Sequence, residues 1–241
     1  MKKLLASAAL AALIVTPSFA DTLAQWTFES SGLSGSTTYA PGAGTATTNF
    51  YAEGGLQAGT AAATGFHTGA ATYSSPAGNG SAKSLSVNTW AVGDYWQLQL
   101  STTGYHGLSL SYDQTSSGTG PRDFALSYSL DGTSFTAIGS TYSVLANAAP
   151  NAPWNAVTSS SAYTMSYDLG SITALEDSPT VYFRITDVDT TSANGGTVAA
   201  AGTDRIDNFS LFTTPVPEPS AAALCGLGCA ALLIRLRKKT A

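Results

Sequence analysis

Apolar side chains alternate with polar ones along many short segments of this chain, and this period of two is the strongest constraint on its fold. In Tyr95–Leu100, three apolar residues would share one face of an extended strand. The other segments with such alternation are Leu23–Phe28, Gly107–Asp113, Phe124–Leu130, Phe135–Ile138, Met165–Leu169, Val181–Ile185 and Ile206–Phe212. Residues 21–212 show no sustained helical period. The predicted fold class is therefore all-β.

Several such strands joined by Gly, Ser and Thr turns predict an antiparallel β-sandwich over residues 21–212. A first strand at Ala24–Phe28 and a last one at Ile206–Phe212 are expected to pair and close a jelly-roll-like arrangement. Residues 30–82 are rich in small side chains, so long loops with one or two short edge strands are expected there. Residues 145–161 are expected to form another loop.

Charge is scarce and unevenly distributed. Charged residues make up 10% of the chain, and six of the ten basic ones lie near its two ends. Between Asp21 and Pro219, four basic residues face fifteen acidic ones, a net charge of −11. Such a surface repels phosphates, which argues against a nucleic-acid partner. Both cysteines lie after residue 220, so the predicted sandwich has no disulfide and no cysteine-based site.

Residues 1–20 have the three parts of an export signal. Two lysines near the start precede the apolar stretch Leu4–Val15, which is expected to form the signal helix. Ser18 and Ala20 place small side chains where a signal peptidase requires them. Cleavage is predicted between Ala20 and Asp21.

The other end also has three parts. Residues 213–220 form a Pro-rich linker that contains Pro217, Glu218 and Pro219. Residues 221–234 carry no charge and predict a transmembrane helix, although fourteen residues span only about 21 Å of a core of about 30 Å. Residues 235–241 form a basic cytoplasmic tail, whose stop cluster is Arg235, Arg237, Lys238 and Lys239.

This ordered end resembles the bacterial PEP-CTERM sorting domain over residues 216–241. The resemblance implies that an exosortase recognises Pro217-Glu218-Pro219, cleaves nearby and releases or transfers the ectodomain. It also implies a Gram-negative-type envelope and, commonly, an exopolysaccharide or biofilm matrix. A plain membrane anchor that is never cut is the alternative. Within the ectodomain, Tyr128–Phe135 and Arg205–Leu211 resemble segments of secreted bacterial β-sandwich modules, and neither implies a binding residue.

Motifs for catalysis are not apparent. His67 and His106 have no serine elbow or HExxH spacing beside them, and both are interpreted as surface or turn residues. The acids show no marked pair of the kind that a glycosidase needs. The chain is therefore expected not to be an enzyme.

Two kinds of ligand site are considered instead. A structural Ca²⁺ site is one hypothesis for four acids near a Gly-rich loop, and solvated turn residues are the alternative. These acids are Asp187, Asp189, Asp204 and Asp207. Trp154 and Tyr163 are candidates for a platform on which a sugar ring stacks, whereas Trp26 and Trp96 are assigned to the core.

The main functional hypothesis is an exported, non-catalytic surface or matrix protein that an exosortase sorts and that has a structural or adhesive role, with exopolysaccharide as a partner. Before processing, the C-terminal helix would hold the ectodomain outside the inner membrane. The alternative is a carbohydrate-binding module with a specific glycan site. A polysaccharide-acting hydrolase is the third hypothesis.

Overall fold

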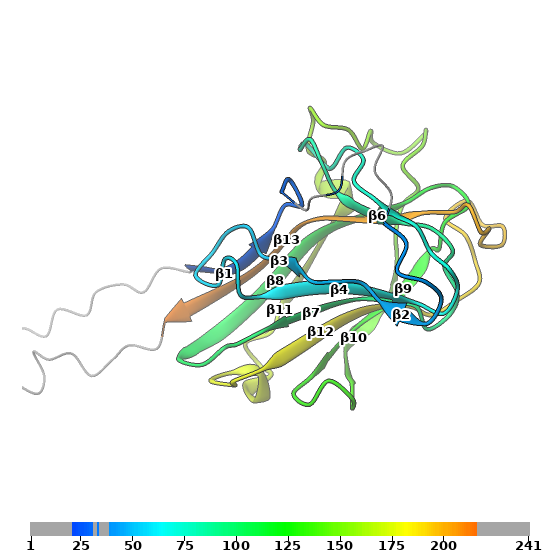
Figure 1. The fold of residues 1–241 in the computed structure, drawn as a ribbon. Coiled ribbons are helices and arrows are strands. Elements are labelled where there is room, and N and C mark those ends of the chain that lie inside the picture. The colour runs from blue at the N-terminus through cyan, green and yellow to red at the C-terminus, as the bar shows by residue number, and fades with distance from the viewer. Residues whose placement is uncertain (1–20, 31–32, 34–38, 216–241) are drawn as a thin grey trace, which may run out of the picture.

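The computed structural model describes residues 21–30, 33 and 39–215 as two antiparallel sheets that face each other in a β-sandwich (Figure 1). The all-β prediction is confirmed. The predicted signal segment, the Pro-Glu-Pro motif, the apolar segment and the basic tail lie outside the described residues. Within the described part of the chain, no helix has the length and apolar character needed to cross a membrane.

The first sheet, called sheet A, has β8 and β13 at its centre. Its strand order is β11-β8-β13-β6-β5, and β1 pairs with β13 in addition. The strands are β1 (Asp21–Trp26), β5 (Tyr73–Ser74), β6 (Leu85–Val87), β8 (Tyr105–Ser116), β11 (Thr164–Asp168) and β13 (Asp204–Pro215).

The second sheet, called sheet B, has the order β10-β9-β12-β7-β4-β2, and β3 pairs with β4. Its strands are β2 (Thr45–Ala46), β3 (Phe50–Tyr51), β4 (Ala62–His67), β7 (Tyr95–Leu100), β9 (Asp123–Ser129), β10 (Thr136–Ser143) and β12 (Val181–Asp187). Two short 3₁₀ turns complete the elements, η1 (Ser161–Tyr163) and η2 (Thr173–Leu175).

The two ends of the domain pair as predicted. Gln25 lies opposite Ser210 and Trp26 opposite Phe209 in the antiparallel β1–β13 ladder. Because β13 continues to Pro215, the last strand extends three residues into the segment predicted as linker. Figure 1 places the start of β1 and the end of β13 at the same end of the sandwich.

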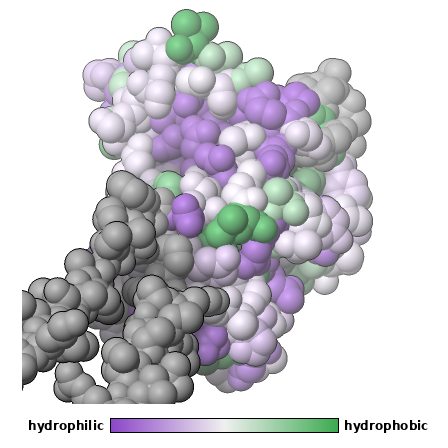
Figure 2. All heavy atoms as spheres, turned by 90° about the vertical axis from the view of Figure 1, so that its left-hand side faces the viewer, coloured by the Kyte–Doolittle hydropathy of each residue, from purple (hydrophilic) through white to green (hydrophobic). Residues whose placement is uncertain are grey.

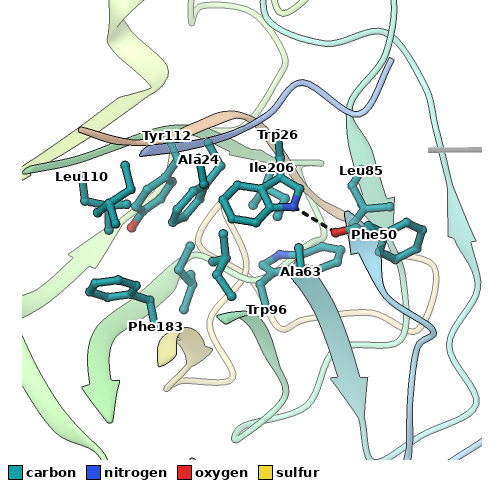
Figure 3. Close-up of a cluster of buried hydrophobic side chains, with 14 of the residues drawn as sticks. Ala24, Trp26, Phe50, Ala63, Leu85, Trp96, Leu110, Tyr112, Phe183 and Ile206 are labelled. Atoms are coloured by element: carbon teal, nitrogen blue, oxygen red, sulfur yellow. Dashed lines mark hydrogen bonds between the residues drawn. The ribbon is translucent and has the colours of Figure 1, made fainter. Parts of the chain in front are cut away.

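The core lies between the sheets. It contains inward residues of the segments with a period of two, such as Leu98 and Phe183, together with residues outside those segments, such as Tyr73, Leu85 and Trp90. Trp26 and Trp96 are each 1% exposed, which confirms their assignment to the core. The indole Nε1 of Trp26, in sheet A, donates to the carbonyl oxygen of Phe50, in sheet B, at 2.9 Å (Figure 3). This bond satisfies a buried polar atom and ties the sheets together.

The expectation of only short edge strands within 30–82 is wrong, because β4 is an internal strand between β7 and β2. Its inward positions hold the small Ala63 and Gly65 and then His67, and Gly65 pairs with Trp96. A Cβ on Gly65 would lie 2.5 Å from the hydroxyl of the buried Tyr73. The large rings of neighbouring elements fill this space, so β4 needs no large apolar side chains of its own.

The outer faces of the two sheets differ. Loops around residues 75–84 and 147–163 lie over sheet A, at the top of Figure 1. Gly80 N donates to Asn155 O, and Asn79 Nδ2 donates to Ser160 O, so the two loops hold each other. Over sheet B, the loop before β10 reaches the outer face, where a Cβ on Gly132 would lie 3.1 Å from the Tyr182 ring and Phe135 contacts Arg184. The outer side chains Gln97 and Gln99 of β7 are partly or fully exposed.

Candidate functional site

A groove of about 450 Å³ lies at one end of the outer face of sheet B. Residues of β3, β4 and β7 line it together with the segments that connect β2 to β3, β3 to β4, β7 to β8 and η2 to β12. Its lining residues are Asn49, Tyr51, Gln57, Thr60, Ala62, Gln99, Leu100, Ser101, Pro179 and Thr180. None of these residues carries a charge, although the domain around them is acidic.

Strand register explains the hollow. Tyr51 pairs with Ala62, Ala62 with Gln99, and Gln99 with Tyr182, so these four residues form one row across the sheet. The small Ala62 stands between larger neighbours and leaves a depression. Tyr51 is 53% exposed, so a large part of its side chain is open to solvent at one side of that depression.

Two amides at the groove differ in their freedom. Gln57 is held to the backbone of Ser101: its Oε1 accepts from Ser101 N at 3.1 Å and its Nε2 donates to Ser101 O. It therefore acts as a fixed wall. Gln99, on β7, is exposed and lines the groove. Asn49 donates weakly to the Tyr51 hydroxyl at 3.4 Å.

The chemistry of this groove suits an uncharged, hydroxyl-rich ligand. An exposed Tyr offers apolar area together with a polar hydroxyl, which matches the alternating apolar and polar surfaces of a sugar ring. Amide and hydroxyl groups can both donate and accept hydrogen bonds. The groove contains no carboxylate pair, the arrangement that glycoside hydrolysis requires.

A stack of rings lies on the same outer face. Phe66 and Tyr95 stack with ring centroids 5.3 Å apart and an angle of 16°. The guanidinium carbon of Arg184 lies 4.0 Å from the Tyr95 ring centroid and 3.8 Å from that of Phe135. The stack therefore joins β4, β7, β12 and the loop before β10.

The prediction that Trp154 and Tyr163 form an exposed sugar platform is wrong. Trp154 is 8% exposed and Tyr163 is fully buried. Their rings meet edge-to-face at 5.3 Å, Trp154 Nε1 donates to Ala77 O at 2.8 Å, and the Tyr163 hydroxyl donates to Ala152 O. Both side chains anchor the loops over sheet A, because each ring packs inward and each polar atom finds a backbone partner.

The four acids considered for calcium do not form one ligand set. Asp204 is buried and accepts hydrogen bonds from Trp96 Nε1 and Gln114 Nε2. Asp207 is also buried, but it accepts hydrogen bonds from Asn79 N and Ser81 Oγ, in a loop over sheet A. Asp189 is exposed and binds Thr191. Across the described residues, no three His, Cys, Asp or Glu side chains gather as a metal site would require.

Burial dominates the titration of three of these acids. It raises the pKa of Asp204 to about 8, that of Asp207 to about 7 and that of Asp187 to about 6. Hydrogen bonds from neighbouring groups oppose the increase in each case. One oxygen of Asp187, Oδ2, has no hydrogen-bond partner among the described residues.

The interpretation of His67 as a surface or turn residue is wrong. It is 2% exposed, its Nδ1 lies 3.2 Å from Asp94 Oδ2, and its ring meets those of Tyr73 and Trp90 edge-to-face. The ring is enclosed by aromatic neighbours, so the His67–Asp94 pair is a structural contact rather than an exposed dyad. His106 lies on β8 and is partly exposed.

The groove could not be found from the sequence, because its residues are of ordinary types and come from separate segments.

Of the predicted processing residues, Ala20 and Pro217-Glu218-Pro219 lie outside the described residues, as do Arg235, Arg237, Lys238 and Lys239. Asp21, on the other side of the predicted cleavage, is the first residue of β1.

Comparison with known proteins gives only distant structural likenesses. No family model matches the chain, and no curated protein matches it. One similar structure contains the CBM22-1–GH10 modules of a Clostridium thermocellum xylanase complexed with xylohexaose, at 16% identity and TM-score 0.38 over 61% of this chain. Another is the CBM22-1 xylan-binding domain of a Paenibacillus barcinonensis protein, at 11% identity and TM-score 0.38, covering 83% of this chain and 99% of that one.

A third is a carbohydrate-binding module from the β-sandwich superfamily, at 12% identity and TM-score 0.38 over 79% of this chain. The chain spans 25% of the xylanase chain and 62% of this third one. The likeness concerns the sandwich fold alone.

Proposed function

We propose that this chain is an exported, non-catalytic glycan-binding protein whose binding face is the outer side of sheet B. The observation that carries the proposal is the uncharged groove between Tyr51 and Gln99. It offers the exposed phenol ring of Tyr51, the exposed side-chain amide of Gln99 and the small Ala62 between them. Concave sites with a few convergent polar groups are the usual places for small ligands and sugars.

A structural or adhesive role in an extracellular matrix follows from this proposal. The matching chemistry is that of a polysaccharide, whose repeated hydroxyls and ring faces can be held by the same groove. From the end at which β1 starts, the surface shows scattered apolar spots among hydrophilic residues and no continuous apolar patch (Figure 2). The coloured part of this end therefore offers no broad apolar docking surface.

The proposed export and sorting of the protein rest on its sequence. We propose that residues 1–20 direct export and that Pro217-Glu218-Pro219, the apolar segment and the basic cluster direct exosortase sorting. Since β1 starts and β13 ends at the same end of the sandwich, a membrane segment after residue 215 would hold that end toward the membrane.

The glycan proposal can be tested with the full chain in detergent, by titration calorimetry against oligosaccharides and by retention on insoluble polysaccharides. Tyr51→Ala and Gln99→Ala should each weaken binding about 5- to 10-fold, roughly 1–1.4 kcal/mol, without changing the melting temperature. Val157→Ala is the control, because Val157 is 89% exposed and is not among the groove residues. Binding that both groove variants retain in full would contradict the proposal.

A further inference from the structure

Arg184 lies on the outer face of sheet B, and its long side chain is held in one conformation by several contacts. Its guanidinium lies between the rings of Tyr95 and Phe135, at 4.0 and 3.8 Å from their centroids. Its Nε donates to Gln97 Oε1 at 2.7 Å. Two stacked rings and one hydrogen bond thus fix both the plane of the guanidinium and its rotation, so little entropy is left to lose on binding.

The charge of Arg184 is not matched by an acid. Within the described residues, no carboxylate lies within ion-pair distance of it. Of the other basic side chains there, Arg122 Nη2 pairs with Asp123 at 2.8 Å and Lys83 Nζ donates to Glu29 O at 2.8 Å. Arg205, on sheet A, also makes no ion pair among the described residues, and its Nε has no hydrogen-bond partner there. An unpaired guanidinium is notable in a segment with fifteen acids and four bases.

Burial lowers the pKa of Arg184, which shows that its surroundings partly desolvate the charge. A partly desolvated cation gains more from an anion than an exposed one does, because the local dielectric is lower. With Nε already bonded to Gln97, the Nη edge is the part that would meet a ligand. That edge matches a planar carboxylate through two parallel hydrogen bonds.

Arg184 and the groove lie on the same face of sheet B. Arg184 pairs with Gln97, and the next pair along the same face joins Tyr182 to Gln99, which lines the groove. Two residues along a strand cover roughly 7 Å, so a glycan chain in the groove would reach the guanidinium with a neighbouring sugar unit.

We propose that Arg184 binds the carboxylate of an acidic sugar, so that the outer face of sheet B recognises a uronate-containing polysaccharide. The uncharged groove holds a sugar ring at Tyr51 and Gln99, and Arg184 selects the acidic unit next to it. The net charge of −11 repels an acidic polymer at long range, but salt screens that repulsion over about 8–10 Å, whereas the contact with Arg184 is direct. This inference rests on the glycan-binding function proposed above and assigns the substrate class to that site.

A purely structural role for Arg184 predicts something different. The stack also fastens the loop before β10 to β7, since Phe135 contacts Arg184. If that were its whole role, replacing Arg184 would change stability and leave the preference between charged and neutral glycans unaltered. The test therefore measures that preference.

The experiment uses the full chain in detergent and three polymers: polygalacturonate, its methyl ester, which keeps the backbone and removes the charge, and dextran sulfate. Wild-type protein should bind polygalacturonate at least 10-fold more tightly than the ester. Arg184→Gln should abolish this preference, measured as the ratio of the affinities for polygalacturonate and for the ester. Arg184→Lys should retain part of it, because an ammonium keeps the charge and lacks the planar fork.

Arg122→Gln is the matched control. Arg122 already pairs with Asp123, so its replacement should leave the preference for the acidic polymer intact. If Arg184→Gln does not fold, Arg184→Lys tests the same residue, and a preference equal to that of the wild type would overturn the role of the planar guanidinium. Equal binding of acid and ester overturns the inference, and so does tighter binding of dextran sulfate than of polygalacturonate. Tyr51-dependent binding without any acid preference leaves the proposed function standing, whereas binding of no polymer, the neutral oligosaccharides included, overturns both.

Discussion

The indole Nε1 of Trp96 in sheet B donates to the carboxylate of Asp204 in sheet A at 2.7 Å. Gln114 Nε2 and Ser116 Oγ also donate to this carboxylate, at 3.1 and 3.2 Å. A buried acid thus serves as the common acceptor for both layers of the sandwich. Buried polar groups of this kind are tolerated when their hydrogen bonds are satisfied.

Stability should fall as the pH rises from about 5 to about 8. The pKa of Asp204 is raised to about 8, that of Asp207 to about 7 and that of Asp187 to about 6, each from 3.8. In this window the folded state holds more protons than the unfolded state, so raising the pH favours unfolding. Urea titrations at pH 5, 6, 7 and 8 would measure the trend, and a free energy of unfolding that increases with pH would contradict it.

Asp204→Asn should flatten the upper part of that profile, between about pH 6 and 8, because the variant has no proton to lose at this position. Asp189→Asn is the control. Hydrogen bonds from Thr191 lower the pKa of Asp189, so its contribution changes at acidic pH, outside this window. The same urea titrations, compared between the two variants, would separate the role of Asp204 from a general effect of removing negative charge.

Tyr73→Phe should be neutral or stabilising. The Tyr73 hydroxyl is buried and has no hydrogen-bond partner among the described residues, and burial raises the pKa of this phenol. An unsatisfied buried hydroxyl costs about 1–3 kcal/mol, and its removal recovers part of that. Thermal denaturation would check the result, and a loss of more than about 1 kcal/mol would show that the hydroxyl has a partner such as a bound water.

Gly65→Ala should destabilise the protein by about 1–3 kcal/mol, because the new Cβ would lie 2.5 Å from the Tyr73 hydroxyl. Adding Tyr73→Phe should restore part of the loss, since the closest clashing atom is removed. Gly118→Ala is the control, with its nearest neighbour at 3.7 Å. Equal effects of Gly65→Ala in both backgrounds would mean that the hydroxyl is not the obstacle.

Trp154→Ala should lower stability by about 3–5 kcal/mol and leave glycan affinity unchanged. Trp154 fastens a loop over sheet A through Tyr163 and Ala77, on the face opposite the proposed site. Limited proteolysis should show earlier cleavage within 147–163. A loss of glycan binding in folded Trp154→Ala protein would restore the sugar platform that the structure argues against.

Strands are predictable from the sequence where their own side chains show whether they are buried. Alternation of large apolar residues identified β7 with its correct bounds, and matching strands at both ends predicted the β1–β13 ladder. By contrast, β4 begins with Ala, Ala, Thr and Gly, and the rings that pack against its Gly65 come from Tyr73 and Trp96. Its signal therefore lies in other segments of the chain and becomes visible only when they are assembled.

Candidate sites were harder to predict because residue type does not reveal exposure. Trp154 between loop residues has the same local pattern whether its ring faces solvent or, as here, packs on Tyr163. His67 was misassigned for the same reason, since its enclosure depends on Asp94 and on rings distant in sequence. The groove at Tyr51 and Gln99 arises from register, which places a small Ala62 between them.

Replacing Pro217, Glu218 and Pro219 together by alanine should leave the protein uncut in the membrane of the producing cell. Two prolines keep a segment extended and accessible, and the carboxylate between them supplies the distinctive group of the proposed exosortase signal. Mass spectrometry of the mature C-terminus would locate the cleavage. Pro41→Ala, which alters a proline within the sandwich, should be processed normally. Normal processing of the triple variant would instead favour the alternative of a permanent membrane anchor.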